Sequence, residues 1–197
     1  SNPESLNLSL AEQATDNLAS ALQSLYDAGA RNFLVVNLPN LGETPLVNEL
    51  DNLFPGISSQ LNDLVGVHNL LLEQKLNNLD ASLPEIDLIT LDTNSLLTEI
   101  INEPSQFGFS NINDSCLINS QIFSSFDFDG VCDNPNEFLF WDDIHPTSAT
   151  HQLVAQTAKN TLQEQEQVHE PSNVLGLGLW AGLILSWLTR SKSKPQQ

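Results

Sequence analysis

At 197 residues, the chain is long enough to form one domain with a sizeable hydrophobic core. It has 25 acidic and 6 basic residues, a net charge of −19, and three of the basic residues (Arg190, Lys192 and Lys194) lie in the last eight positions. Such a negative charge repels nucleic acid, which excludes DNA and RNA as partners. Solubility in an extracellular setting explains the charge better than binding of a specific cationic ligand does.

The first part of the chain is predicted to form a helix followed by a strand. Residues 9–28 carry three leucines at helical spacing, and Gly29 follows as a stop signal. These leucines are Leu18, Leu22 and Leu25. The run Asn32–Leu38 is short and apolar, as expected of a buried strand in a parallel sheet. Two prolines and a glycine in residues 39–45 then predict a loop, at the end of the strand where α/β folds usually bind ligands.

The rest of the body continues the alternation of helix and strand. The predicted elements are a long helix from Ile57 to about Leu79, a strand at Ile86–Leu91, a helix through about Asn102, a loop-like stretch at 104–137 and a last helix at about Ser148–Gln167. This order implies a parallel sheet covered by helices on both faces. No internal repeat is visible.

Two cysteines, Cys116 and Cys132, lie in the loop-like stretch. A disulfide between them would close and stiffen that stretch, and two unpaired buried thiols are the alternative. A zinc site is not expected, because the chain has no Cys-x-x-Cys pair.

The most informative motif is Phe140-Trp-Asp-Asp-Ile-His-Pro-Thr147. Asp142 stands three residues before His145 and could accept a hydrogen bond from one ring nitrogen. The other nitrogen would then be free to deprotonate a serine, as in a Ser-His-Asp hydrolase. The spacing has a plainer interpretation too: a helix start, with Thr147 or Ser148 as N-cap and acids favoured by the helix dipole.

The C-terminal part ends in an apolar run. Residues 174–188 carry no charge, and the basic residues follow immediately. A helix of this length falls somewhat short of a bilayer core of about 30 Å. An apolar run followed by basic residues is nevertheless the arrangement expected of a C-terminal anchor with its basic end in the cytoplasm. A packed core helix is the alternative, which three glycines within the run disfavour.

The segment 138–151, with its Asp-x-x-His-Pro-Thr, closely resembles the last signature block of the GDSL (SGNH) esterase and lipase family. Residues 25–45, His68-Asn69 and Pro104-Ser-Gln-Phe-Gly-Phe109 resemble further parts of that family in the same order, so the resemblance covers roughly residues 10 to 165. It implies a three-layer, flavodoxin-like α/β fold with a parallel sheet, and a serine ester hydrolase that needs no cofactor and no metal.

The same resemblance implies that Asp142 and His145 are the triad acid and base, with Asp143 one position off. No Gly-Asp-Ser nucleophile block occurs, and Asn113-Asp114 lacks the glycine two places before it. We therefore expect residues 1–167 to be the C-terminal part of such a hydrolase, without the strand that carries the nucleophile. The expected substrate is a small-molecule or lipid ester.

Residues 168–197 resemble a PEP-CTERM sorting tail, in which Val168-His-Glu-Pro-Ser172 precedes the apolar segment. Such tails are processed by an exosortase, so the resemblance implies a bacterial protein that is secreted or held at the cell surface. An exported protein favours the Cys116–Cys132 disulfide. A second hypothesis is a remnant without activity, displayed as a non-enzymatic surface module.

Overall fold

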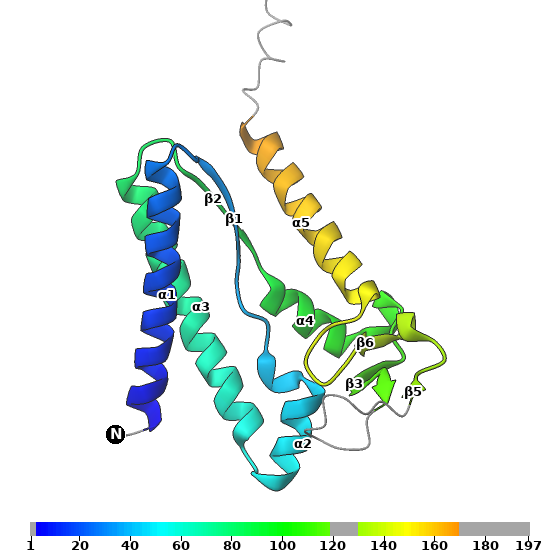
Figure 1. The fold of residues 1–197 in the computed structure, drawn as a ribbon. Coiled ribbons are helices and arrows are strands. Elements are labelled where there is room, and N and C mark those ends of the chain that lie inside the picture. The colour runs from blue at the N-terminus through cyan, green and yellow to red at the C-terminus, as the bar shows by residue number, and fades with distance from the viewer. Residues whose placement is uncertain (1–2, 119–129, 170–197) are drawn as a thin grey trace, which may run out of the picture. The chain divides into compact units, whose positions relative to one another are not determined.

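The computed structural model describes residues 3–118 and 130–169 (Figure 1). The predicted apolar anchor at 174–188 and its basic tail lie outside the described residues. The chain divides into two units, residues 1–161 and 162–197, and all the strands in the described ranges belong to the first. Within the described ranges, no helix combines the length and the apolar character needed to cross a membrane.

The first half of the chain alternates helices with strands, as expected. Its elements are α1 (Pro3–Asp27), β1 (Asn32–Val36), the 3-10 turn η1 (Leu41–Glu43), α2 (Pro45–Leu53), α3 (Ile57–Ser82), β2 (Asp87–Leu91) and α4 (Thr93–Asn102). The second half consists of η2 (Pro104–Phe107), β3 (Asn111–Ser115), β4 (Leu117–Ile118), β5 (Gly130–Val131), η3 (Pro135–Glu137), β6 (Phe138–Phe140) and α5 (Ser148–His169). The fold is therefore mixed α/β with parallel strands.

Helix α1 begins six residues earlier than its leucine spacing predicts and ends where Gly29 predicts. Gly29 adopts a positive φ of 104°, and the next amide, of Ala30, donates to the carbonyl of Leu25 at 3.0 Å. This left-handed residue ends the helix because glycine has no Cβ to oppose that conformation. Along its length α1 packs beside α3 (Figure 1).

Strands β1 and β2 pair in parallel, with Leu34 opposite Ile89. Helix α3 forms part of the long crossover that a parallel pair requires. One face of the pair is packed against α1 and α3, where Val35 joins a buried cluster with Leu22, Leu72 and Leu76. On the other face of β1, Leu34 and Val36 remain exposed.

Helix α2 was not expected, because its first residue, Pro45, reads as a loop residue in the sequence. Proline fits the first turn of a helix, where its missing N–H has no partner to lose. The helix then turns sharply into α3. The carboxylate of Asp51 accepts hydrogen bonds from the amides of Gly56 and Ser58, at 2.9 and 3.0 Å. Gly56 has a φ of 96°.

The carboxyl end of β1 is tied to the start of α4 by Asn37. Its side-chain oxygen accepts hydrogen bonds from the amides of Thr93 and Asn94, at 2.8 and 3.2 Å. Its amide nitrogen donates to Asp92 at 2.8 Å. Asp92 in turn caps α4 by accepting from the amide of Ser95. These bonds fix α4 relative to the parallel pair.

The stretch 104–137, expected to be loop-like, contains short strands in its described part. Strand β3 pairs in parallel with β6, and β4 pairs in antiparallel fashion with β5. The second core of the protein forms where α4 and β6 meet, with partly buried residues of α5 packed against it. Its buried members are Leu96, Ile100, Phe109, Leu139 and Phe140. This core holds the strand from which the Asp142–His145 loop departs.

Candidate active site

The candidate site lies on the loop that joins β6 to α5, and its base is closed by hydrogen bonds. The hydroxyl and amide of Thr147 bond to the carbonyls of Phe138 and Leu139, at 2.8 and 3.0 Å. The amide of Trp141 donates to the carbonyl of His145 at 2.7 Å. The loop therefore leaves and rejoins the core over a short span, with buried Leu139 and Thr147 at its two ends.

Asp142 organises the inside of this loop. One of its carboxylate oxygens, Oδ1, accepts hydrogen bonds from the backbone amides of Ile144 and His145, at 2.9 and 2.6 Å. Aspartate side chains commonly accept from backbone two or three residues ahead, which stabilises a turn. The same carboxylate meets Nδ1 of the His145 ring, at 2.9 Å from Oδ2 and 3.1 Å from Oδ1. The structure thus brings the two sequence-predicted site residues together.

The electrostatics of this pair fix the form of the histidine. Partial burial acts to raise the pKa of the Asp142 carboxyl, but hydrogen bonds from the His145 and Ile144 amides and from the His145 side chain outweigh it and lower the pKa. An ionised carboxylate can only accept hydrogen bonds, so Nδ1 must carry the proton between the two groups. In the neutral ring, Nε2 is then left with its lone pair free.

The His145 ring is open to an incoming reactant, because its side chain is 72% exposed. Within residues 3–118 and 130–169, no serine or threonine hydroxyl hydrogen-bonds to this ring. In this part of the chain, the hydrogen-bond partner of the His145 ring is the carboxylate of Asp142.

The helix-start interpretation of the motif holds as well. Thr147 precedes the first residue of α5, and its hydroxyl accepts from the amide of Thr150 at 3.3 Å. The Asp142–His145 pair lies in the loop before that cap. The helix start accounts for Thr147, whereas the carboxylate of Asp142 bonds to its own loop and to the His145 ring.

Asp143 points to different partners than Asp142 does. Its carboxylate accepts a hydrogen bond from the hydroxyl of Ser115 on β3 at 2.7 Å. Its backbone carbonyl accepts from the amide of Leu46 on α2 at 2.9 Å. Ser115 was not singled out in the sequence, because it lies 28 positions away in a stretch without a recognisable pattern.

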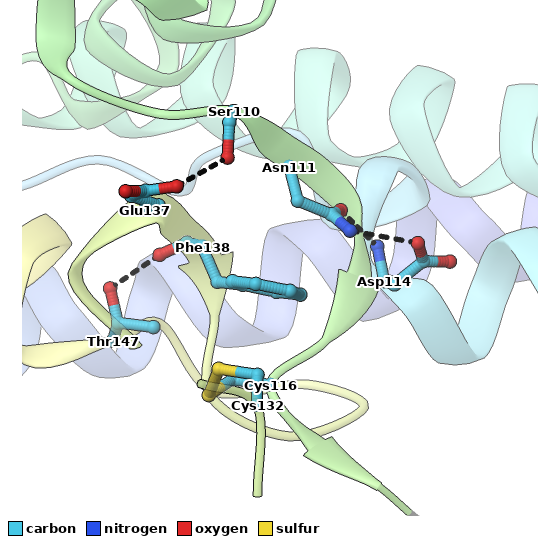
Figure 2. The surroundings of a disulfide bond; sticks show 8 residues. All are labelled: Ser110, Asn111, Asp114, Cys116, Cys132, Glu137, Phe138 and Thr147. Carbon is cyan, nitrogen blue, oxygen red and sulfur yellow. Dashed lines mark hydrogen bonds between the residues drawn. A yellow bond between two sulfur atoms is a disulfide. The ribbon is translucent and has the colours of Figure 1, made fainter. Parts of the chain in front are cut away.

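The residue after Ser115, Cys116, is bonded to Cys132 in a disulfide (Figure 2). Their Cα atoms are 4.9 Å apart, within the usual range for a disulfide. Cys116 is fully buried, and its amide donates to the carbonyl of Phe140 at 3.0 Å. The disulfide therefore ties the end of β3 to the segment after β5, and the backbone bond of Cys116 holds it beside β6, the strand that leads into the site.

A cavity of about 410 Å³ opens beside this loop. Its lining is almost entirely apolar and comes from the end of β1, from α4, and from the loop and α5. Representative lining residues are Val36, Leu38, Leu96, Ile100, Ile144 and Pro146.

Comparison with known proteins places these features in a family. The model of the family described as GDSL-like lipase/acylhydrolase matches residues 4–158. A GDSL esterase/lipase of Arabidopsis thaliana is 32% identical over 142 residues, which cover 70% of this chain and 39% of the relative. A second one from the same plant is 30% identical over 145 residues, 71% of this chain and 38% of the relative.

A bacterial relative gives a similar match. An uncharacterized protein of Pseudomonas putida, from the trpE–trpG intergenic region, is 33% identical over 150 residues, which cover 74% of this chain and 24% of the relative. The chain thus spans about two fifths of the length of its plant relatives and a quarter of this bacterial one.

Proposed function

Because the chain belongs to the family of GDSL-like lipases and acylhydrolases, we propose that it supplies the acid and the base of a serine ester hydrolase. The base is His145 and the acid that orients it is Asp142. The observation that carries the proposal is the 2.9 Å contact between Nδ1 and Oδ2, which leaves Nε2 of an exposed ring free.

In the proposed reaction, Nε2 of His145 takes the proton of a serine hydroxyl as its oxygen attacks the carbonyl carbon of the ester. The ionised carboxylate of Asp142 stabilises the imidazolium that forms. His145 then gives the proton to the oxygen of the leaving alcohol, and the bond between that oxygen and the acyl carbon breaks. A water molecule, deprotonated by the same ring, releases the acid and restores the serine.

The nucleophile and the oxyanion donors belong, in this proposal, to sequence outside these 197 residues. The absence of a Gly-Asp-Ser block from the chain and its coverage of 39% of a plant relative support this division. We propose that the same sequence completes a three-layer, flavodoxin-like sheet and contributes the strand before the serine. The parallel pairing of β1 with β2 supports that architecture.

The substrate we propose is a small-molecule or lipid ester, hydrolysed without a cofactor. The similarity to two plant esterase/lipases supports the ester class.

We further propose that residues 1–167 form the hydrolase part and that 168–197 form a sorting tail. The uncharged run 174–188 and the basic residues after it support a membrane anchor processed by an exosortase-like enzyme. The protein would then be secreted or held at the surface of a bacterial cell. The intact mass of the native protein tests this: loss of the last residues supports processing, and an uncut C-terminus together with a soluble protein would contradict the anchor.

The catalytic proposal is tested by His145→Ala in the longest polypeptide that carries this sequence in its source cells. We expect loss of p-nitrophenyl acetate hydrolysis, because the serine loses its base, with the protein still folded by circular dichroism. His151→Ala, an exposed histidine on α5, is the matched control and should retain activity. Substantial hydrolysis by His145→Ala would refute the assignment. Asp142→Asn should also lower the activity strongly and Asp143→Asn only slightly; the reverse order would reassign the acid.

A further inference from the structure

We infer that Ser115 is a positioning residue for the Asp142–His145 pair and that it acts through Asp143. This inference rests on the proposed function, since it concerns the orientation of the proposed base. It starts from the 2.7 Å hydrogen bond that the Ser115 hydroxyl donates to Oδ1 of Asp143.

The bonds within the site loop are local. In the described part of the chain, the Asp142 carboxylate hydrogen-bonds to Ile144 and His145, and the amide of Trp141 donates to the carbonyl of His145. Such bonds make the loop a stiff unit, but they do not set its direction relative to the rest of the protein. That direction depends on bonds to other elements.

Among the described residues, three hydrogen bonds connect the loop to β3, β4 and α2. The carbonyl of Trp141 accepts from the amide of Leu117 at 2.7 Å, and the carbonyl of Asp143 accepts from the amide of Leu46 at 2.9 Å. The third is the Ser115–Asp143 bond, in which both side chains are half-buried. The Ser115–Asp143 bond is made by side chains, so it is lost when either residue is replaced. The other two bonds join backbone atoms, which most substitutions leave in place.

The position of Asp143 constrains the backbone from which Asp142 projects, because the two residues share a peptide group. A hydrogen bond to a carboxylate is stronger than one between neutral groups, so the Ser115 hydroxyl holds Asp143 in one place relative to β3. Ser115 is itself held firmly, since the neighbouring Cys116 is fully buried and bonded to Cys132 (Figure 2). The serine thus transmits the rigidity of the disulfide-bonded strand to the catalytic loop.

The chain offers a matched control on the same strand region. The hydroxyl of Ser110 also donates to a carboxylate, Oε2 of Glu137, at 3.0 Å (Figure 2). That pair joins the start of β3 to the turn before β6 and does not reach the site loop. It therefore has the same chemistry as the Ser115–Asp143 pair without its connection to Asp142.

The experiment measures kcat and KM for p-nitrophenyl acetate, together with the melting temperature, in the longest native polypeptide that carries this sequence. We expect Ser115→Ala and Asp143→Ala each to lower kcat roughly tenfold with KM nearly unchanged, because a misdirected base slows proton transfer but not binding. The double variant should be no worse than either single one, since both remove the same bond. Ser115→Thr and Asp143→Asn keep a donor and an acceptor and should retain most of kcat.

Ser110→Ala should match the wild type in kcat. The inference is overturned if Ser115→Ala also matches the wild type, or if its loss of activity only follows a fall in melting temperature. If Ser115→Ala fails to fold, the kcat and melting temperature of Asp143→Ala test the inference in the same way. If neither variant folds, the bond has a role in stability alone and the inference is overturned. Full activity of His145→Ala would instead refute the proposed function, so the two failures are distinguishable.

Discussion

At the scale of single residues, Asp142 combines two roles that are usually separate. It stabilises the turn by accepting two backbone amides, and it fixes the tautomer of His145 by accepting Nδ1. Both roles require the ionised carboxylate. The stability of the loop and the orientation of the His145 ring should therefore depend on the same titration.

This dependence predicts how Asp142→Asn changes with pH. The pKa of the Asp142 carboxyl is lowered in the folded protein, so its contribution to stability is fully present above the ordinary pKa of about 3.9 and is lost as the pH falls through the folded value. The difference in free energy of unfolding between the wild type and Asp142→Asn should be largest near pH 7 and shrink in more acidic solution than about pH 4. Urea titrations of both proteins, at pH 7 and in solution more acidic than about pH 4, measure this difference in free energy of unfolding. A difference that stays constant or grows on acidification would contradict this account.

At the scale of elements, η1 packs unusually closely on α3 at Gly42. The amide of Gly42 donates to Oδ1 of Asn62 at 2.8 Å, and its carbonyl accepts from the hydroxyl of Ser58 at 2.9 Å. A Cβ at this position would overlap the carbonyl oxygen of Ser58 and lie 2.5 Å from Oδ1 of Asn62. The contact between the two elements therefore requires glycine.

Two glycine substitutions should consequently have opposite effects. We expect Gly42→Ala to destabilise the protein by about 1–3 kcal/mol, because backbone atoms must move apart. Gly66→Ala, in the exposed middle of α3 with open space around its Cβ, should stabilise it by roughly 0.5–1 kcal/mol. Chemical denaturation of both variants measures the two effects. Equal effects, or a neutral Gly42→Ala, would show that η1 can shift on α3.

The elements also show which parts of the fold are encoded locally. Periodic leucines and a short apolar run predicted α3 and β1 within a few residues, because each signal lies inside the element itself. Strand β3, with the sequence Asn-Ile-Asn-Asp-Ser, has no such signal and forms by pairing with β6. The geometry of Asp142 and His145 could be anticipated because they are three residues apart. The bond between Ser115 and Asp143 could not, since only the tertiary fold brings them together.

At the scale of the whole molecule, β1 has an unpaired edge together with an exposed apolar face. Among the described residues it pairs only with β2, and Leu34 and Val36 on its outer face are 38% and 50% exposed. The apolar cavity of about 410 Å³ begins at Val36. An unpaired strand edge beside uncovered apolar surface favours pairing with another strand. In the longer polypeptide we propose, its additional strand would cover this edge.

The 197-residue chain alone should therefore associate with itself through β1. A lysine at an edge strand opposes such pairing, because it would bring charge into an apolar contact. We expect sedimentation velocity to show concentration-dependent association of the chain, and Val36→Lys to shift it toward the monomer. Leu53→Lys is the control: Leu53, at the end of α2, is 61% exposed but lies on no strand. If both variants associate as the unchanged chain does, the uncovered edge of β1 is not the contact, and the case for a further strand at that edge loses its support.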